Sequence, residues 1–270
     1  MAGFESGRRL CLLFESGLGR FAVEATSVME VANPDADGVS IRGHLDLVDL
    51  SQRLGGAPEP PPGVGVVLDV SPTLAVRVKR IVEVADVARD PLFLIPPGMG
   101  ETLALLVRGA ILHGGRLYLE LIAEALPHPK PAHGAALSRP IYLLDQPPDR
   151  ALVFESQGKL YGIPLALVSQ VVPATEAFTP MPMAKGPVAG FFPHAQALWP
   201  VYTPAGLLGG GAVREELLVM TELAGQNVGL TASRVLGVHA GLIPATERGE
   251  YTAPGLSTAA LFLDLQRMFS

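Results

Sequence analysis

The stretch LFESGLGRFAV, from Leu13 to Val23, decides the fold because the chain states it twice. Its second copy, VFESQGKLYGI, runs from Val153 to Ile163, 140 positions later and without a gap. Each copy alternates apolar and polar residues, breaks at small residues and alternates again, which predicts a strand–turn–strand hairpin. An internal repeat sets the architecture, so we predict that the chain holds two copies of one domain.

The repeat continues downstream of the hairpin. LAVRVKRIVEV, from Leu74 to Val84, aligns with VGLTASRVLGV, from Val228 to Val238, at an offset of 154. LYLEL, from Leu117 to Leu121, aligns with LFLDL, from Leu261 to Leu265, at an offset of 144. Loops of different length account for the changing offset. We therefore predict two homologous domains of roughly 120 to 135 residues, near the commonest domain size.

Proline marks the expected boundary between the domains. Positions 127, 129, 131, 140, 147 and 148 are all proline, and a proline-rich segment is a semi-rigid spacer. We place domain 1 at 8–127, the linker at 128–148 and domain 2 at 149–270. Ile141 to Leu144 are apolar within this linker, and we expect them to pack on a domain.

The remaining patterns predict an all-β protein. Short runs rich in Val, Ile and Leu alternate with turn residues along both halves, as in small barrels or sandwiches. Only short helices are expected, near 51–54, 123–126 and 205–209. Cys11, the one cysteine, lies in the first predicted strand, and we expect it to be reduced and buried.

Composition restricts the class of partner and the compartment. The chain is 49% apolar and 17% charged, as globular domains are, with a net charge of −6 and no basic tract. A nucleic-acid partner is therefore not expected, because phosphate binding needs clustered cations. The apolar run after Arg9 is short and is followed by Glu15, and no run of about 18 apolar residues exists. We expect a cytoplasmic protein.

No pattern predicts catalysis or a cofactor. The six histidines, at 44, 113, 128, 133, 194 and 239, form no His-Glu-x-x-His motif and have no cysteine at metal-ligand spacing. No Gly-x-Ser-x-Gly elbow occurs, and the glycine run 209–211 lacks the lysine of a phosphate loop. We predict a non-enzyme with no metal or cofactor. A small-ligand-binding or hydrolytic β-barrel remains an alternative, which a deep polar pocket would reveal.

Four motifs, in order, resemble those of CheW-like domains, the scaffold modules of bacterial chemosensory systems. They are the paired strands of Leu13 to Val31, the run from Val39 to Leu50, the strand from Leu74 to Val84 and the hairpin from Gly109 to Glu120. The second half repeats most of them. The resemblance implies two SH3-like five-stranded β-barrels in each domain. It also implies a non-catalytic adaptor in chemotaxis signal transduction.

The two copies differ from the family and from each other. Ala195 and Gln196 stand where the family has Arg-Gly, and Thr203 stands where it has aspartate. Lys79 and Ser233 replace another aspartate of the pattern. These departures motivate an alternative function, a diverged CheW-like regulator that binds a dedicated motility or polarity protein outside the standard array.

The resemblance also suggests where partners bind and which partners they are. An arginine that ends a strand beside a groove suits a charge-assisted contact, although Arg42 could instead form a local ion pair with Asp46 or Asp49. By resemblance, the partners are a CheA-type histidine kinase, chemoreceptor cytoplasmic tips or other CheW-like domains. The candidate protein-binding residues are Val28, Glu30, Arg42, Gly43, His44, Asp46 and Trp199.

Overall fold

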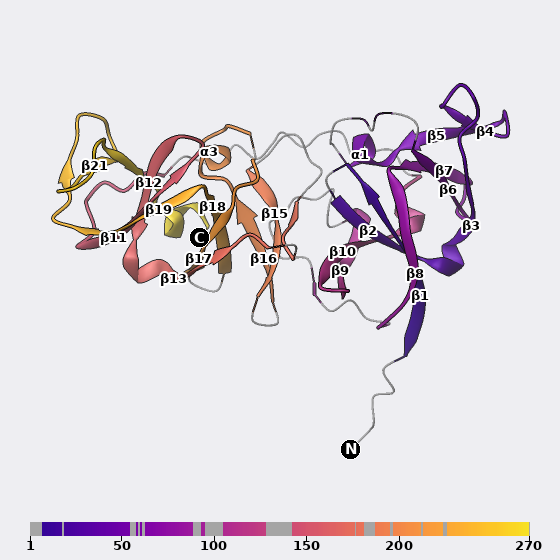
Figure 1. Ribbon diagram of the computed structural model, residues 1–270, viewed down its shortest axis with the longest axis horizontal. Helices are drawn as coiled ribbons and strands as arrows, with labels where there is room; N and C mark the ends of the chain where they lie inside the picture. The colour runs from indigo at the N-terminus through magenta and orange to yellow at the C-terminus, as the bar shows by residue number, and fades with distance from the viewer. Residues whose placement is uncertain are drawn as a thin grey trace, which may run out of the picture. The chain divides into compact units, whose positions relative to one another are not determined.

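The computed structural model confirms an all-β protein with short helices (Figure 1). It describes residues 7–17, 19–54, 58, 60, 63–88, 93–94, 105–127, 142–175, 177–180, 187–194, 197–211, 213–223 and 226–269. In this part of the chain, no helix is long and apolar enough to cross a membrane. The predicted linker lies largely outside the described residues.

Ten strands form the first half. They are β1 Arg8–Ser16, β2 Gly19–Glu24, β3 Val28–Ala32, β4 Ser40–Ile41, β5 Leu45–Asp49, β6 Val64–Leu68, β7 Leu74–Val78, β8 Arg80–Ala88, β9 Val107–His113 and β10 Arg116–Leu121. The helices are η1 Ala25–Ser27, α1 Leu50–Arg53 and η2 Ala123–Ala125. Two five-stranded sheets result: sheet 1 has the order β8-β1-β2-β10-β9, and sheet 2 has the order β3-β6-β7-β5-β4.

The second half repeats this plan. Its strands are β11 Arg150–Ser156, β12 Lys159–Pro164, β13 Val168–Pro173, β14 Thr179–Pro180, β15 Val188–His194, β16 Ala197–Tyr202, β17 Leu217–Leu223, β18 Gln226–Ala232, β19 Arg234–Ala240, β20 Ile243–Pro244, β21 Glu250–Thr252 and β22 Ala260–Phe262. Its helices are η3 Leu165–Leu167, α3 Pro204–Leu207 and α4 Leu265–Met268. Sheet 3 has the order β13-β17-β18-β16-β15-β14, and sheet 4 has the order β19-β11-β12-β22-β21-β20. Each matches a first-half sheet, with one added edge strand.

The predicted hairpin forms in both halves and in the same register. Phe14 lies opposite Phe21 in β1–β2, and Phe154 lies opposite Tyr161 in β11–β12. The predicted alignment of the last strands, LYLEL over LFLDL, is wrong. Leu119 pairs with Phe21 in the first half, and Leu261 pairs with the equivalent Tyr161 in the second half. The offset there is 142, not 144. A shift of two residues leaves the same side chains on each face of a strand, so the apolar pattern could not detect it.

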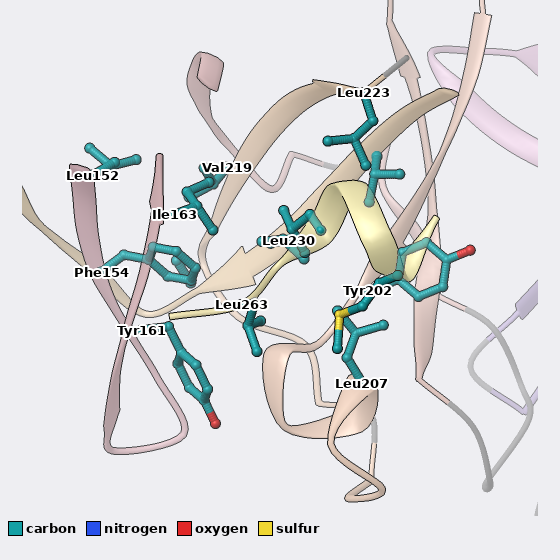
Figure 2. Close-up of a cluster of buried hydrophobic side chains, with 14 residues drawn as sticks. Leu152, Phe154, Tyr161, Ile163, Tyr202, Leu207, Val219, Leu223, Leu230 and Leu263 are labelled. Atoms are coloured by element: carbon teal, nitrogen blue, oxygen red, sulfur yellow. The ribbon is translucent and has the colours of Figure 1, made fainter. Parts of the chain in front are cut away.

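The second half buries its main core between sheets 3 and 4 (Figure 2). Phe154 and Tyr161 from sheet 4 meet Leu230 from sheet 3 in this cluster, and Leu263 and Leu265 join them near the C-terminus. Tyr142 and Leu143 of the predicted linker also pack against it, as expected. Cys11 is fully buried in the equivalent first half, again as expected.

The described residues divide into two compact units that differ from the predicted domains. Unit 1 also includes residues of the predicted second domain. Unit 1 takes its described residues from Met1–Gly134, Glu176–Lys185 and Pro193–Leu198. Unit 2 takes them from Ala135–Thr175, Gly186–Phe192 and Trp199–Ser270. Within unit 1, the hydroxyl of Thr179 donates to the carbonyl of Leu117 at 3.1 Å. Either half expressed alone would therefore lack residues of its unit, so the experiments below use the full chain.

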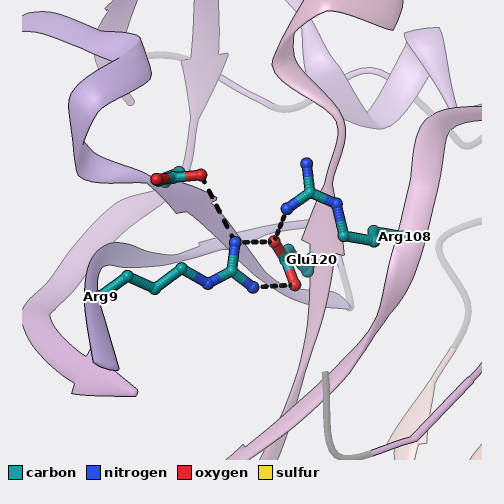
Figure 3. A network of polar contacts seen from close by, with 4 residues as sticks. Arg9, Arg108 and Glu120 are labelled. Carbon is teal, nitrogen blue, oxygen red and sulfur yellow. Dashed lines mark hydrogen bonds and ion pairs between the residues drawn. The ribbon is translucent and has the colours of Figure 1, made fainter. Parts of the chain in front are cut away.

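A buried ion-pair network lies inside sheet 1 (Figure 3). The two terminal nitrogens of Arg9 lie 2.6 Å from the two carboxylate oxygens of Glu120, and Arg108 lies 3.0 Å from one of them. Glu120 is 1% exposed and Arg9 is 8% exposed. At the equivalent place in sheet 4, the strand register puts Phe262 beside Gly162. The first domain thus holds charges where the second holds an aromatic ring.

A second charge difference explains one departure from the family pattern. Asp49 accepts the backbone N–H that caps α1 and pairs with Arg77 at 3.1 Å, with both side chains mostly buried. In the second domain Thr203 caps α3 in the same way. The repeat puts Thr231 at the place of Arg77, and both threonines are fully buried. Threonine replaces the aspartate because the arginine that would neutralise its charge is also absent.

Candidate protein-interaction site

The candidate site in the first domain lies where the two edge strands of sheet 2 approach each other. Glu30 lies in β3, at one edge, and Arg42 directly follows β4, at the other. The guanidinium of Arg42 lies 2.5 Å from the Glu30 carboxylate. This ion pair connects the two edges of the curled sheet. The structure thus brings together two predicted site residues, and Arg42 pairs with Glu30 rather than with Asp46 or Asp49.

Asp35 shapes the segment that presents Arg42. One oxygen of its carboxylate accepts the N–H of Gly43 at 2.7 Å, and the other accepts the N–H of Arg42 at 3.1 Å. These hydrogen bonds hold the Arg42–Gly43 turn in the left-handed region, where φ is +54° at Arg42 and +70° at Gly43. Glycine adopts this region without cost, whereas arginine does so at a cost of about 1–2 kcal/mol. Asp35 therefore stabilises an unusual backbone next to the exposed cation.

Asp37 closes the first part of the same loop. Its carboxylate accepts the N–H groups of Val39 and Ser40 at 2.9 and 3.2 Å, and the Ser40 hydroxyl bonds to both aspartates. The bond from the Gly43 N–H chiefly lowers the pKa of Asp35, and the bond from the Val39 N–H chiefly lowers the pKa of Asp37. Neither aspartate is among the predicted site residues, although aspartates in an Asp-x-Asp-Gly segment commonly organise such turns.

Two apolar side chains, which the sequence analysis did not select, flank Glu30. Met29 is 60% exposed and Val31 is 45% exposed, while Val28 is half-buried. Exposed apolar side chains and arginine are residue types found at protein interfaces, although Glu30 and Val31, as neighbours in a strand, point to opposite faces. We call Met29, Glu30, Val31, Arg42, Gly43 and His44 the β3–β4 surface.

The other predicted residues lie differently. His44 is exposed, and its Nδ1 lies 2.7 Å from the carbonyl oxygen of Arg42. Asp46 is exposed in β5, opposite Ser40. Trp199 is 2% exposed in β16, so its ring lies in the interior of this structure and belongs to no exposed surface. It was selected because aromatic residues are enriched at interfaces, a statistical signal that carries no information about burial.

The second domain does not reproduce this charge pair. Gln170 in β13 stands at the place of Glu30, with Val171 exposed next to it as Val31 is. Ala195 and Gln196, which replace Arg-Gly, lie outside the described residues. Across the described residues, no three His, Cys, Asp or Glu side chains gather so that they could hold a metal ion.

Comparison with known proteins gives one family match. The description CheW-like domain fits residues 150–268. No curated protein matches the chain. Among solved structures, the chain is similar to the scaffolding protein TtCheW from Thermoanaerobacter tengcongensis at 13% identity, with a TM-score of 0.36. That alignment covers 46% of this chain and 95% of the other.

The fold and the site define the class: an all-β protein of two repeated domains with a charged and apolar surface at the edge of one sheet. The match to the CheW-like domain lies in the second half, at residues 150–268. The first half, which the family description does not cover, has the same two sheet orders apart from the added edge strands.

Proposed function

We propose that this protein is a non-catalytic, cytoplasmic adaptor in bacterial chemosensory signalling. It would couple chemoreceptors to a CheA-type histidine kinase through protein–protein contacts. The observation that carries the proposal is the CheW-like domain at 150–268, together with a first half of the same sheet order. Two linked domains of this kind increase the effective concentration of one partner near another without any new contact.

The β3–β4 surface is our candidate for the partner contact. Arg42 keeps 67% of its side chain exposed even though it pairs with Glu30. An exposed pair of this kind contributes little to folding, about 0–1 kcal/mol. The same pair holds the arginine in place for a partner carboxylate, and a positioned arginine loses less freedom on binding. Met29 and Val31 would supply the apolar part of the contact.

The test measures binding of the full chain to the regulatory domain of the CheA-type kinase and to a chemoreceptor cytoplasmic tip from the same organism. We expect micromolar binding, and the Arg42→Glu variant should weaken it about tenfold or more, because the reversed charge would face the partner's carboxylate. The matched control is Arg248→Glu in the second half, since Arg248 is also exposed and ion-paired, with Asp145 of the predicted linker. Equal weakening by both variants, or no binding to either partner, would contradict the proposal.

A second candidate function rests on the second domain. Gln170 replaces Glu30 there, so this domain lacks the acid of the charge pair. The chain could then be a diverged regulator that binds a dedicated motility or polarity protein outside the standard array. Affinity capture with the full chain as bait distinguishes the two functions. Recovery of array proteins, lost in the Arg42→Glu variant, supports the adaptor, and recovery of non-array proteins alone supports the regulator.

A further inference from the structure

A short segment of the predicted linker is built into unit 2 as an additional strand. Residues 142–145, which we call the linker strand, lie beside the end of β22. Leu143 forms a β-bridge with Leu263, and the N–H of Leu144 donates to the carbonyl of Phe262 at 3.1 Å. The linker strand precedes the residues that match the family description, so that match does not account for it.

The two leucines of the linker strand pack against two different apolar clusters. Leu143 packs against the main core of the second half, and Leu144 packs against a second cluster, which contains Tyr251. The hydroxyl of Tyr251 also donates to the Leu144 carbonyl at 2.9 Å. Gly249 leaves room for Leu143, because a Cβ at Gly249 would lie 2.6 Å from the Leu143 Cβ. This part of unit 2 is therefore shaped to accept the linker strand.

Arg267 of α4 contacts both ends of the linker strand. Its guanidinium carbon lies 4.6 Å from the centroid of the Tyr142 ring, a cation–π contact, and its Nη1 lies 4.0 Å from a carboxylate oxygen of Asp145. Asp145 also pairs with Arg248 at 2.9 Å, but both side chains are largely exposed, so this pair adds little to the attachment. We call Gly249, Tyr251, Phe262, Leu263 and Arg267 the linker-binding surface.

The first half fills the equivalent position with a different segment. The strand register places Asp264 at the position of Ile122. The N–H of Asp264 donates to the carbonyl of Tyr142 in the linker strand at 2.9 Å. The N–H of Ile122 donates at the same distance to Leu106, the residue directly before β9. In the second half, the chain before β21 forms the added strand β20 instead. The fold thus requires an acceptor for this N–H but does not fix which segment supplies it.

We propose that the linker-binding surface is a docking site for an extended segment, and that the linker strand of a second copy of this chain can occupy it in place of the chain's own. A second copy is the partner because its linker strand carries the sequence that fits here. Main-chain pairing supplies the affinity of such a contact, and the alternating side chains supply its specificity.

The connection to the rest of the domain favours such an exchange. Residues 146–149 alone join the linker strand to β11, and Pro147 and Pro148 among them have no N–H to donate and favour an extended chain. An extended connection carries the strand away from its own domain and toward another copy. Exchange in both directions gives a closed dimer. This inference goes beyond the adaptor proposal, since it concerns residues absent from the β3–β4 surface.

The first experiment measures fluorescence anisotropy of a labelled peptide of residues 140–147 with the full-length protein. The test variant, Leu143→Ser with Leu144→Ser, removes the apolar side chains of the chain's own linker strand and so frees the surface. We expect it to bind the peptide at least about tenfold more tightly than the native protein, in which the internal strand competes at a roughly millimolar effective concentration. The control variant, Leu208→Ser with Leu217→Ser, removes two half-buried leucines beside the same main core and should bind the peptide as the native protein does.

The second experiment mixes two full-length variants that carry different fluorophores at their N-termini. One is the test variant, whose linker-binding surface is free. The other is Gly249→Leu, in which the new side chain blocks the surface and so releases an intact linker strand. We expect energy transfer in this mixture, and at least about tenfold less between two copies of either variant. The smaller change Gly249→Ala should give the same result if Gly249→Leu does not fold.

Three outcomes would overturn the inference. They are equal peptide affinity of the test variant and the control, equal binding of a peptide that carries the same two serines, and absence of energy transfer in the mixture. Circular dichroism verifies that each variant is folded, and Leu144→Ser alone should give an intermediate peptide affinity if the double variant does not fold. The Arg42→Glu variant separates this inference from the adaptor proposal, because adding it to the test variant should leave peptide affinity unchanged. A failure of kinase binding would likewise leave the peptide result intact.

Discussion

Replacing Glu120 by glutamine tests the buried network inside sheet 1. Glutamine has nearly the same shape as glutamate but carries no charge and has only one acceptor oxygen. Arg9 would then lose its main anionic partner while only 8% exposed, and Glu24 is the one other carboxylate near it, at 3.5 Å. Arg108, which is 45% exposed, can turn to water instead. The substitution therefore mainly leaves the buried charge of Arg9 without its anionic partner.

The expected loss of stability follows from this burial. Breaking a buried ion pair by removing one partner costs about 3–5 kcal/mol, because the remaining charge is left uncompensated. The amide oxygen can still accept one hydrogen bond and Glu24 remains, so we expect the lower end, about 3 kcal/mol. For a unit of this size, that corresponds to a decrease in Tm of roughly 10 °C.

The assay is urea unfolding followed by circular dichroism, with differential scanning calorimetry for Tm. The exposed Glu124→Gln substitution in the same unit is the control, and it should change stability by less than about 0.5 kcal/mol. The double variant Arg9→Met with Glu120→Met should recover most of the loss, because apolar pairs can replace buried ion pairs. A loss below about 1 kcal/mol in Glu120→Gln would refute the network, as would a double variant less stable than the single one.

Three further predictions concern the differences between the domains and the loop of the candidate site. In Gly162→Ala, the new methyl carbon would lie 2.3 Å from the Phe262 ring. We therefore expect urea unfolding to show a loss of stability of about 1–3 kcal/mol. An unchanged stability would contradict this packing. Arg77→Thr alone should lower the free energy of unfolding by about 3 kcal/mol, because it leaves Asp49 buried without its cation. Adding Asp49→Thr should restore most of this stability. A double-mutant cycle that finds the two effects additive would show that the pair is not coupled. The pKa of Asp35 is lowered in the folded protein, so its contribution to loop stability is complete above the ordinary aspartate pKa of about 4 and is lost as the pH falls through the lower folded value. NMR should therefore show amide chemical shifts of the loop that are constant from about pH 7 to about 5 and change only below about pH 4.

The fold could be predicted because its signals are local and repeated. The hairpin needs only alternation and turn residues, and its second copy at Val153 to Ile163 excludes coincidence. The register of the last strand could not be predicted, because LYLEL and LFLDL match at more than one even shift. In the second half, Gly162 leaves room for the Phe262 ring beside it.

The candidate site was only partly predictable. The sequence selected Glu30 and Arg42 separately, but only three-dimensional closure of sheet 2 shows that they pair. Asp35 was not selected, since its function depends on the backbone N–H groups of a turn seven residues later. Burial also cannot be derived for an isolated aromatic residue, which is why Trp199 was selected although its side chain lies in the interior.

The two domains show how one sheet architecture tolerates different charges. Both keep a glutamate in the first strand paired with an arginine in the neighbouring strand of the sheet, as Glu15 with Arg80 and Glu155 with Arg234. A buried pair changes together, because Thr203 and Thr231 stand at the places of Asp49 and Arg77. The exposed pair of Glu30 and Arg42 is also lost as a pair, because Gln170 stands at the place of Glu30, and Ala195 and Gln196 stand where the family has Arg-Gly. Because solvent already neutralises much of an exposed charge, stability does not require these residues, and partner binding is the remaining explanation that the proposed experiments test.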